Sequence, residues 1–214
     1  MDSRTQLFAD TAAANEPLLG ELRALLDQLG STENLISLTA ATDALAEPAI
    51  ANWEVFRKFI SAYKLKVLYG RELGAIYRAY AHARSSEARE LVALDQELAA
   101  VASLKPFAKA SRRIAYAQLQ TLARLRGERV PGKYLAAVQE DRAHGWHMLV
   151  YGLLLAVYSI PVRQGLVSYA RQILQSYVRT AGQAFGASME EREQFLEILC
   201  ADLLPEVERV LKTP

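Results

Sequence analysis

Cysteine is nearly absent from the chain, since Cys200 is the single one among 214 residues. One thiol excludes an internal disulfide and any metal site that needs several cysteines. It also fits a protein of the reducing cytoplasm. Leucines lie close to Cys200 in the sequence and no basic residue stands next to it to stabilise a thiolate. We therefore interpret it as a small apolar residue of a C-terminal helix.

A net excess of either charge is also lacking: 25 basic residues face 24 acidic ones, and the formal net charge is +1. Such a chain has no overall field that would draw it to nucleic acid or to an anionic membrane. Basic residues do gather between positions 105 and 129, where Arg112 and Arg113 would form a strip on one helix. Solvated helix surface explains this strip, and no helix-turn-helix signal accompanies it, so we expect no nucleic-acid partner.

Long hydrophobic runs are scarce as well. Residues 1–19 hold acidic residues and no sustained apolar core, which argues against a secretory signal. The stretch 145–162 lacks Asp, Glu, Lys and Arg, and its length approaches the lower limit for a membrane span. Its glycines, tyrosines and Pro161 make a buried helix the better interpretation. We expect a cytoplasmic protein without a membrane segment.

Local motifs of catalysis are missing. The GxSxG elbow, the P-loop, the GxGxxG turn, the HExxH pair and Asp-rich magnesium clusters are all absent. His144 and His147 are close enough in sequence to share a helix face, but no third metal ligand accompanies them. We interpret the pair as a polar patch at a helix end or as a buried histidine with hydrogen-bond partners. The sequence predicts no catalytic residue, no metal and no cofactor.

Helical periodicity is what the sequence does contain. Large apolar residues recur at steps of three and four from Trp53 to Val67, which places them on one side of a helix. Asn52 stands where an N-cap side chain would accept a hydrogen bond from an early backbone N–H. Gly70 marks the expected end of this helix.

The same reasoning predicts further helices, and no segment alternates with the period of a strand. Neither a linker nor a low-complexity run divides the chain. We therefore expect an all-α, single-domain bundle of roughly eight to ten helices, with residues 1–17 as a flexible N-terminal segment. The further helices expected are 18–29, 72–83, 87–104, 107–126, 134–142, 147–158, 162–185 and a last one from the N-cap Ser188 toward Leu211, bent or interrupted at Pro205.

Tyrosine is abundant, with 10 copies. Buried tyrosines would pack in the core with each hydroxyl reaching a partner. Exposed together, they would form an interface rich in binding anchors. The sequence leaves both alternatives open for the tyrosines of the two most apolar predicted helices, which are Tyr151, Tyr158, Tyr169 and Tyr177.

An ordered series of motifs runs through the second half of the chain. The segment 147–152 reads HMLVYG, and an apolar stretch, the turn Ser-Ile-Pro at 159–161 and a helix with Tyr169 follow it. Upstream, 105–111 reads KPFAKAS, preceded by a helix pair over 53–81. In order and spacing these segments resemble the UreF family of urease accessory proteins. The corresponding family motifs are H-x-P-V-V-x-G, a G-[IL]-P-like turn and K-E-L-R-x-A-S.

The resemblance implies an all-α, non-enzymatic scaffold that forms a homodimer. In the family, such a protein bridges a second accessory protein, UreD (also called UreH), to the GTPase UreG. That assembly delivers nickel to apo-urease. UreD/UreH, UreG and apo-urease are therefore the partners that the resemblance implies.

Two of the family's motifs are altered in this chain. The P-x-G-x-F-S-H-S-x-G-L-E segment corresponds to 35–41, without its histidine and glycines. The A-A-V-R-L-x-P-L-G-Q segment corresponds to 180–189, with glutamine in place of the arginine. If the partner surface keeps the family's position, it lies on and beside these segments. The partner-binding residues that the resemblance implies are Ser37, Thr39, Thr42, Tyr177, Gln183 and Ser188.

Two other functions are compatible with an all-helical chain. One is a ligand-binding protein or enzyme of the haem oxygenase or TenA type, in which His144, His147 or tyrosines would line an internal pocket. The other is the ligand-sensing part of a regulator, although no DNA-binding module accompanies it. A closed cavity ringed by polar groups would favour the first, and exposed apolar patches would favour the scaffold.

Overall fold

The computed structural model describes residues 42, 45, 47–126 and 129–212, and every regular element in these residues is helical. The all-α class is confirmed. The predicted helix at 18–29, the segment 1–17, Ser37 and Thr39 lie outside the described residues. In chain order the elements are α4 (Trp53–Tyr63), the π-helix η1 (Lys64–Glu72), α5 (Leu73–Arg84), α6 (Ala88–Ala99), the 3-10 helix η2 (Ala102–Phe107), α7 (Ala108–Arg126), α8 (Val130–Gln139), α9 (His147–Val157), α10 (Val162–Ala184), α11 (Met189–Cys200) and α12 (Leu203–Lys212).

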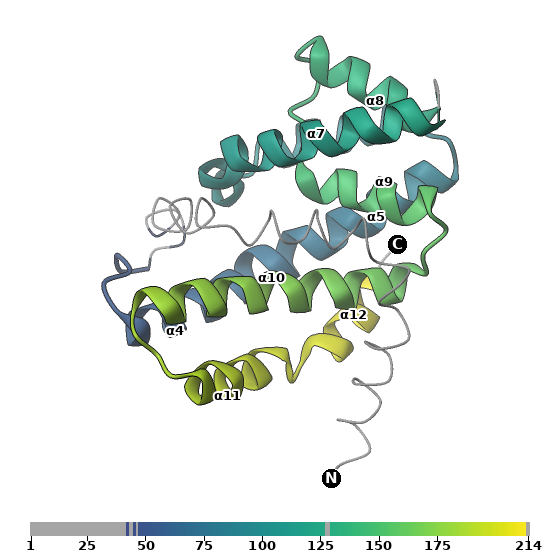
Figure 1. The fold of residues 1–214 in the computed structure, drawn as a ribbon. Coiled ribbons are helices and arrows are strands. Elements are labelled where there is room, and N and C mark those ends of the chain that lie inside the picture. Colours follow the sequence, from purple (N-terminus) through teal and green to yellow (C-terminus); the bar gives the residue numbers. More distant parts are fainter. Residues whose placement is uncertain (1–41, 43–44, 46, 127–128, 213–214) are drawn as a thin grey trace.

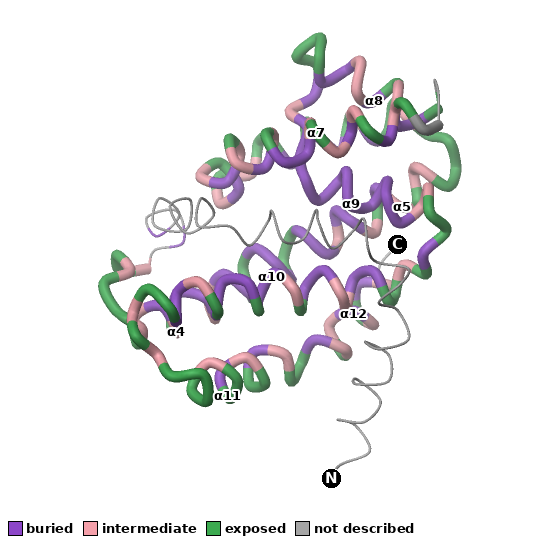
Figure 2. Tube along the Cα trace, viewed as in Figure 1, coloured by how far each residue is buried: buried purple, intermediate pink, exposed green. Residues whose placement is uncertain are grey.

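The helices stack in four tiers (Figure 1). α7 and α8 form one outer tier, α5 and α9 the next, α4 and α10 the third, and α11 with α12 the other outer tier. One hydrophobic cluster runs through all of them. α9 lies between α7 and α5, and Figure 2 shows it buried along most of its length. The prediction of a buried helix there is confirmed, and none of the described helices has the length and apolar composition needed to cross a membrane.

α4, η1 and α5 form one continuous helical rod, so the predicted end at Gly70 is wrong. A glycine ends a helix by taking a left-handed conformation, and Gly70 is not among the described glycines with positive φ. The rod instead widens into a π-helix, in which the backbone N–H of Leu73 bonds to the carbonyl oxygen of Leu68. A Cβ atom at Gly70 would lie 3.1 Å from the Leu65 carbonyl oxygen, so glycine suits this wider turn.

Prolines lie near the other helix boundaries. The helix predicted over 87–104 ends at Ala99, and Pro106 belongs to the separate 3-10 helix η2, which leads into α7. α8 starts four residues before the predicted Tyr134, with Pro131 in its first turn, and it ends at Gln139. The predicted interruption of the last helix near Pro205 is confirmed: α11 ends at Cys200 and α12 begins at Leu203, with Pro205 in its first turn, where its missing N–H costs nothing.

Both predicted N-caps are confirmed. The Asn52 side chain accepts a hydrogen bond from the backbone N–H of Val55 at 3.0 Å and begins α4. Ser188 begins α11 with a capping box, in which its hydroxyl accepts the N–H of Glu191 and the Glu191 carboxylate accepts the N–H of Ser188.

Gly152 allows α9 to lie against α5 backbone to backbone. A Cβ atom at this position would stand 2.6 Å from the carbonyl oxygen of Ile76 and 2.8 Å from the Cβ of Ala79. Neither atom can move without displacing the helix. The glycine of the HMLVYG segment is therefore a steric requirement of this helix pair.

Candidate functional site

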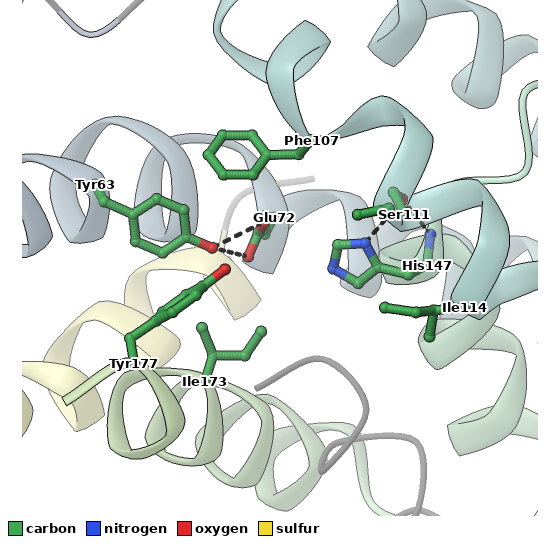
Figure 3. Close-up of a pocket in the computed structure, with 9 residues that line it drawn as sticks. Tyr63, Glu72, Phe107, Ser111, Ile114, His147, Ile173 and Tyr177 are labelled. Atoms are coloured by element: carbon green, nitrogen blue, oxygen red, sulfur yellow. Dashed lines mark hydrogen bonds between the residues drawn. The ribbon is translucent and has the colours of Figure 1, made fainter. Parts of the chain in front are cut away.

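A cluster of hydrogen-bonded polar side chains lies in the middle of the core, where α4, η1, α7, α9 and α10 meet; Figure 3 draws its members other than Tyr169. We call this cluster the polar centre. All of its members are buried. They are Tyr63, Glu72, Ser111, His147 and Tyr169.

Glu72 is the acidic member of the polar centre, and it accepts hydrogen bonds from tyrosine hydroxyls. The Tyr63 hydroxyl lies 3.2 Å from both carboxylate oxygens, and the Tyr169 hydroxyl donates to Oε2 at 3.1 Å. No lysine or arginine among the described residues pairs with it. Burial raises the pKa of Glu72 to about 7, against the lowering effect of the hydrogen bonds from Tyr169 and Tyr63. Glu72 therefore changes its charge near neutral pH.

The π-helix is what brings Tyr63 and Glu72 together, although they stand nine positions apart. In an α-helix, at about 100° per residue, two such side chains would point in opposite directions. A π-helix turns by about 80° per residue, so the nine steps make about two full turns. Both side chains consequently face the same side of the rod.

His147 is held at both of its ring nitrogens. Nδ1 lies 2.8 Å from the Ser111 hydroxyl oxygen, and Nε2 lies 2.7 Å from the Tyr169 hydroxyl oxygen. Burial lowers the pKa of His147 to about 4, so the ring is neutral at physiological pH.

The hydrogen bonds fix the tautomer of this neutral ring. While Glu72 is ionised, Tyr169 donates its one proton to it, so the Tyr169 oxygen accepts and Nε2 of His147 carries the ring proton. Nδ1 then accepts from the Ser111 hydroxyl. The Ser111 oxygen in turn accepts the backbone N–H of His147 at 2.9 Å. Each donor in this series of hydrogen bonds, from Ser111 to Glu72, has one acceptor.

A small cavity adjoins the polar centre. Its volume is about 20 Å³, which is room for a single water molecule. This cavity is too small for the organic ligand that the haem oxygenase or TenA alternative requires. Figure 3 shows the side chains around it. Its lining residues are Tyr63, Glu72, Phe107, Ala110, Ser111, Ile114, His147, Ile173 and Tyr177.

The tyrosines of α9 and α10 belong to the core, which confirms the first of the two alternatives for three of them. Tyr151 donates to the carbonyl oxygen of Gly165 at 3.1 Å, Tyr169 belongs to the polar centre, and the Tyr177 ring lies edge-on to that of Tyr63 at 5.4 Å. Burial raises the pKa of all three, so they keep their hydroxyl protons. Tyr158, at the end of α9, is 37% exposed.

A second buried carboxylate, Asp95 of α6, is bound in a different way. Its oxygens accept the backbone N–H groups of His144 at 2.5 Å, Gly145 at 2.9 Å and Trp146 at 3.3 Å. The Tyr134 hydroxyl also donates to it, at 2.5 Å. We call these contacts the Asp95 clamp. Because the three N–H groups are consecutive, the clamp fixes the loop that leads into α9 and so positions His147.

The two neighbouring histidines serve separate contacts. His144 lies in the clamped loop, with Nε2 2.8 Å from the Ala108 carbonyl oxygen and its ring 4.5 Å from that of Trp146. His147 begins α9 and is hydrogen-bonded and buried, as one of the two interpretations predicted. In the part of the chain that the structure describes, no three His, Cys, Asp or Glu side chains gather closely enough to hold a metal ion.

A third buried charge, Lys64, fastens the rod to the corner between α11 and α12. Its ammonium group lies 2.9 Å from the Asp202 carboxylate and 3.1 Å from the Leu199 carbonyl oxygen. Tyr69 also donates to Asp202, at 2.9 Å. Cys200 lies beside this contact, and burial raises the pKa of its thiol. A protonated, partly buried thiol agrees with its interpretation as a packing residue.

The structure separates the residues that the resemblance assigned to partner binding. Thr42 and Tyr177 are buried at 4% and 5% exposure. Gln183 and Ser188 are exposed, at the end of α10 and the start of α11. Met189, which follows them, is an apolar side chain with 67% exposure.

The sequence did not single out Glu72 or Asp95. The available signal was a lone acidic residue within an apolar pattern: Asp95 stands next to Leu94 and among other buried leucines of α6. For Glu72 this signal was hidden, because an α-helical projection places it away from the apolar face that includes Tyr63.

The comparison with known families fits this architecture. The family model of UreF matches residues 50–184, a segment that includes every residue of the polar centre and of the Asp95 clamp. No curated protein matches the chain. Because the matched segment covers more than half of an all-helical chain, the chain belongs to the UreF family of urease accessory proteins.

Proposed function

We propose that this protein is a scaffold in the nickel-dependent maturation of urease, where it bridges a UreD/UreH-type accessory protein and a UreG-type GTPase to apo-urease. The observation that carries this proposal is the UreF match over residues 50–184. The small size of the cavity beside the polar centre supports it, because about 20 Å³ leaves room for one water molecule and none for a substrate. In this function the protein works in the cytoplasm, without a catalytic residue or cofactor of its own.

The corner between α10 and α11 is the partner surface that we favour. It consists of Gln183, Ser188 and Met189, and all three side chains are exposed. Methionine adapts its shape to different partners, which makes an exposed one a useful contact. Ser188 also caps α11, so it holds the corner in shape.

The exposed side of α11 extends this surface with acidic groups. Glu190, Glu193 and Glu197 are exposed on the same helix, and Glu193 follows Met189 by one helical turn. An apolar contact bordered by carboxylates suits a partner face with an apolar centre and a basic rim. Thr42 and Tyr177 are buried, so neither side chain belongs to this exposed surface.

Co-purification tests the proposal. The tagged full-length chain is expressed with UreD/UreH and UreG from the same source, and light scattering gives the mass of the complex. We expect a stable complex that contains both partners, built on a homodimer of the 23.7 kDa chain. A monomer that captures neither partner would contradict the scaffold function.

A charge substitution tests where the partner binds. Met189→Glu should weaken capture at least about tenfold, equivalent to about 1.4 kcal/mol of binding free energy. Leu65→Glu is the matched control, because Leu65 is 59% exposed and its neighbour Lys64 contacts the opposite end of α11. Both variants should keep the circular dichroism spectrum of the wild type. Equal capture by the two variants would remove the corner from the proposal.

A further inference from the structure

The polar centre contains an unbroken series of hydrogen bonds from Ser111 to Glu72. Ser111 donates to Nδ1 of His147, Nε2–H donates to Tyr169, and Tyr169 donates to the Glu72 carboxylate. The heavy-atom distances are 2.8, 2.7 and 3.1 Å. All of these groups are buried, and the water-sized cavity touches the series at Ser111, His147 and Glu72.

We propose that this series is a proton-operated switch, in which uptake of one proton by the polar centre reverses every hydrogen bond between Ser111 and Glu72 and changes the tautomer of His147. The switch is a property of the buried centre and does not depend on the scaffold function.

The proton balance of the switch closes. One proton enters from the cavity at the Ser111 oxygen, and Ser111 passes the proton it held to Nδ1 of His147. Nε2 passes its proton to the Tyr169 oxygen, and Tyr169 passes its own to the Glu72 carboxylate. The centre ends with one additional proton, a neutral Glu72 and a neutral His147 protonated at Nδ1.

Both states keep the hydrogen bonds of the series, with donor and acceptor exchanged. After proton uptake the Glu72 carboxyl donates to Tyr169, Tyr169 donates to Nε2, and Nδ1–H donates to the Ser111 oxygen. The second carboxyl oxygen of Glu72 still accepts from Tyr63. The hydroxyl proton of Ser111 then turns from Nδ1 toward the water-sized cavity that Ser111 lines, so the core can bind the proton without opening.

The surroundings of Glu72 favour reversible uptake. The groups that face it are hydroxyls: Tyr63 from α4, Tyr169 and Tyr177 from α10, and through Tyr169 the neutral ring of His147 from α9. No charged group of the described residues forms a pair with it. Burial raises the pKa of Glu72 to about 7, which places the transition near neutral pH.

Nitrogen NMR of the histidine ring tests the switch directly. The full-length chain is labelled with ¹⁵N at histidine, and the His147 signals are assigned with a His147→Gln variant. From pH 5.5 to 8.5 we expect the protonated ring nitrogen to change from Nδ1 at low pH to Nε2 at high pH, with a midpoint near 7. One unchanging tautomer across this range overturns the proposal.

Two variants interrupt the series at different places. In Glu72→Gln the His147 tautomer should not depend on pH. In Ser111→Ala the Nδ1–H form loses its acceptor, so His147 should keep its proton on Nε2 while the Glu72 carboxyl, followed by ¹³C NMR, still titrates. Persistence of the pH-dependent change in Glu72→Gln overturns the proposal.

A monovalent cation is the competing occupant of the centre, and a salt comparison distinguishes it. The titration is repeated with ammonium, potassium or choline as the added cation. A midpoint that is the same in all three supports a proton switch. A midpoint that moves with ammonium or potassium but not with choline overturns it in favour of a cation site.

Discussion

Two buried carboxylates lie in the same core and are bound by opposite kinds of donor. Asp95 accepts three consecutive backbone N–H groups and one tyrosine hydroxyl. Glu72 accepts only tyrosine hydroxyls and stands beside a cavity. Backbone N–H groups cannot turn away or accept a proton, whereas hydroxyl groups can do both. The comparison teaches that backbone donors make a buried acid a fixed support for a loop, whereas hydroxyl donors allow the hydrogen bonds around the acid to reverse.

The largest expected effect is that of Asp95→Asn. The amide nitrogen would face backbone N–H donors or Tyr134, which leaves buried donors without acceptors. We expect a loss of about 2–4 kcal/mol in the free energy of unfolding, measured by urea denaturation at pH 7. Asp141→Asn is the control: this residue pairs with Arg112 at the surface, with 79% exposure of its side chain, and should cost less than about 1 kcal/mol. Equal losses in the two variants would contradict the role of the clamp.

Glu72→Gln should change how the free energy of unfolding depends on pH, and not only its value at one pH. The folded pKa of Glu72, about 7, lies above its ordinary value of 4.5. The folded protein therefore holds a proton that the unfolded chain releases, and this stability is complete below pH 4.5 and lost as the pH rises through 7. Removing the carboxyl removes that loss.

The measurement is the free energy of unfolding of both proteins at pH 5 and at pH 8. Relative to the wild type, the free energy of unfolding of Glu72→Gln should rise by about 2–3 kcal/mol on going from pH 5 to pH 8. A constant difference at both pH values would show that Glu72 does not titrate in the folded protein.

His147→Gln should show the mirror image. Burial lowers the pKa of His147 in the folded protein from 6.5 to about 4. At a pH between these values the unfolded chain binds a proton and the folded protein does not, which is a penalty in the free energy of unfolding. That penalty is absent above pH 6.5 and grows as the pH falls through 4. Relative to the wild type, the variant should gain about 2 kcal/mol on going from pH 8 to pH 5.

The two opposing shifts nearly cancel in the wild type, since one reduces stability as the pH rises and the other as it falls. The contribution of this pair should therefore be almost flat between pH 5 and pH 8, and each single variant should reveal one slope. Two variants with slopes of the same sign would contradict the assignment of the two pKa shifts.

The smallest effects belong to a matched pair of hydroxyl deletions. Tyr134→Phe removes one donor from Asp95, and Tyr63→Phe removes one donor from Glu72. Each should cost about 1 kcal/mol at pH 8. At pH 5 the cost of Tyr63→Phe should shrink, because neutral Glu72 needs that donor less. A cost of Tyr63→Phe that is independent of pH would contradict the difference between the two acids.

Much of the fold could be predicted because helical periodicity, N-caps and prolines act over short distances. The caps at Asn52 and Ser188 and the buried character of α9 follow from neighbouring residues alone. The failure at Gly70 has a physical cause: a π-helix is stabilised by the packing of the completed core, and no local signal marks it.

The polar centre could be predicted only in part. His147 and Tyr169 stand in the motifs that resemble the UreF family, and Ser111 closes the KPFAKAS segment. Their connection to Glu72 spans 97 positions from Tyr169 and depends on the altered phase of η1. Interactions between such distant residues arise from tertiary packing, which a single sequence does not display.

The contact at Gly152 fixes the distance between α5 and α9. Glu72 ends η1, four positions before Ile76 of α5, and His147 begins α9, five positions before Gly152. Both groups therefore lie close to the contact between the rod and α9. The spacing of the two helices is set by main-chain atoms and the Cβ of Ala79, which no side-chain rotation can move. We therefore expect thermal motion of side chains elsewhere in the core to leave the distance between Glu72 and His147 almost unchanged.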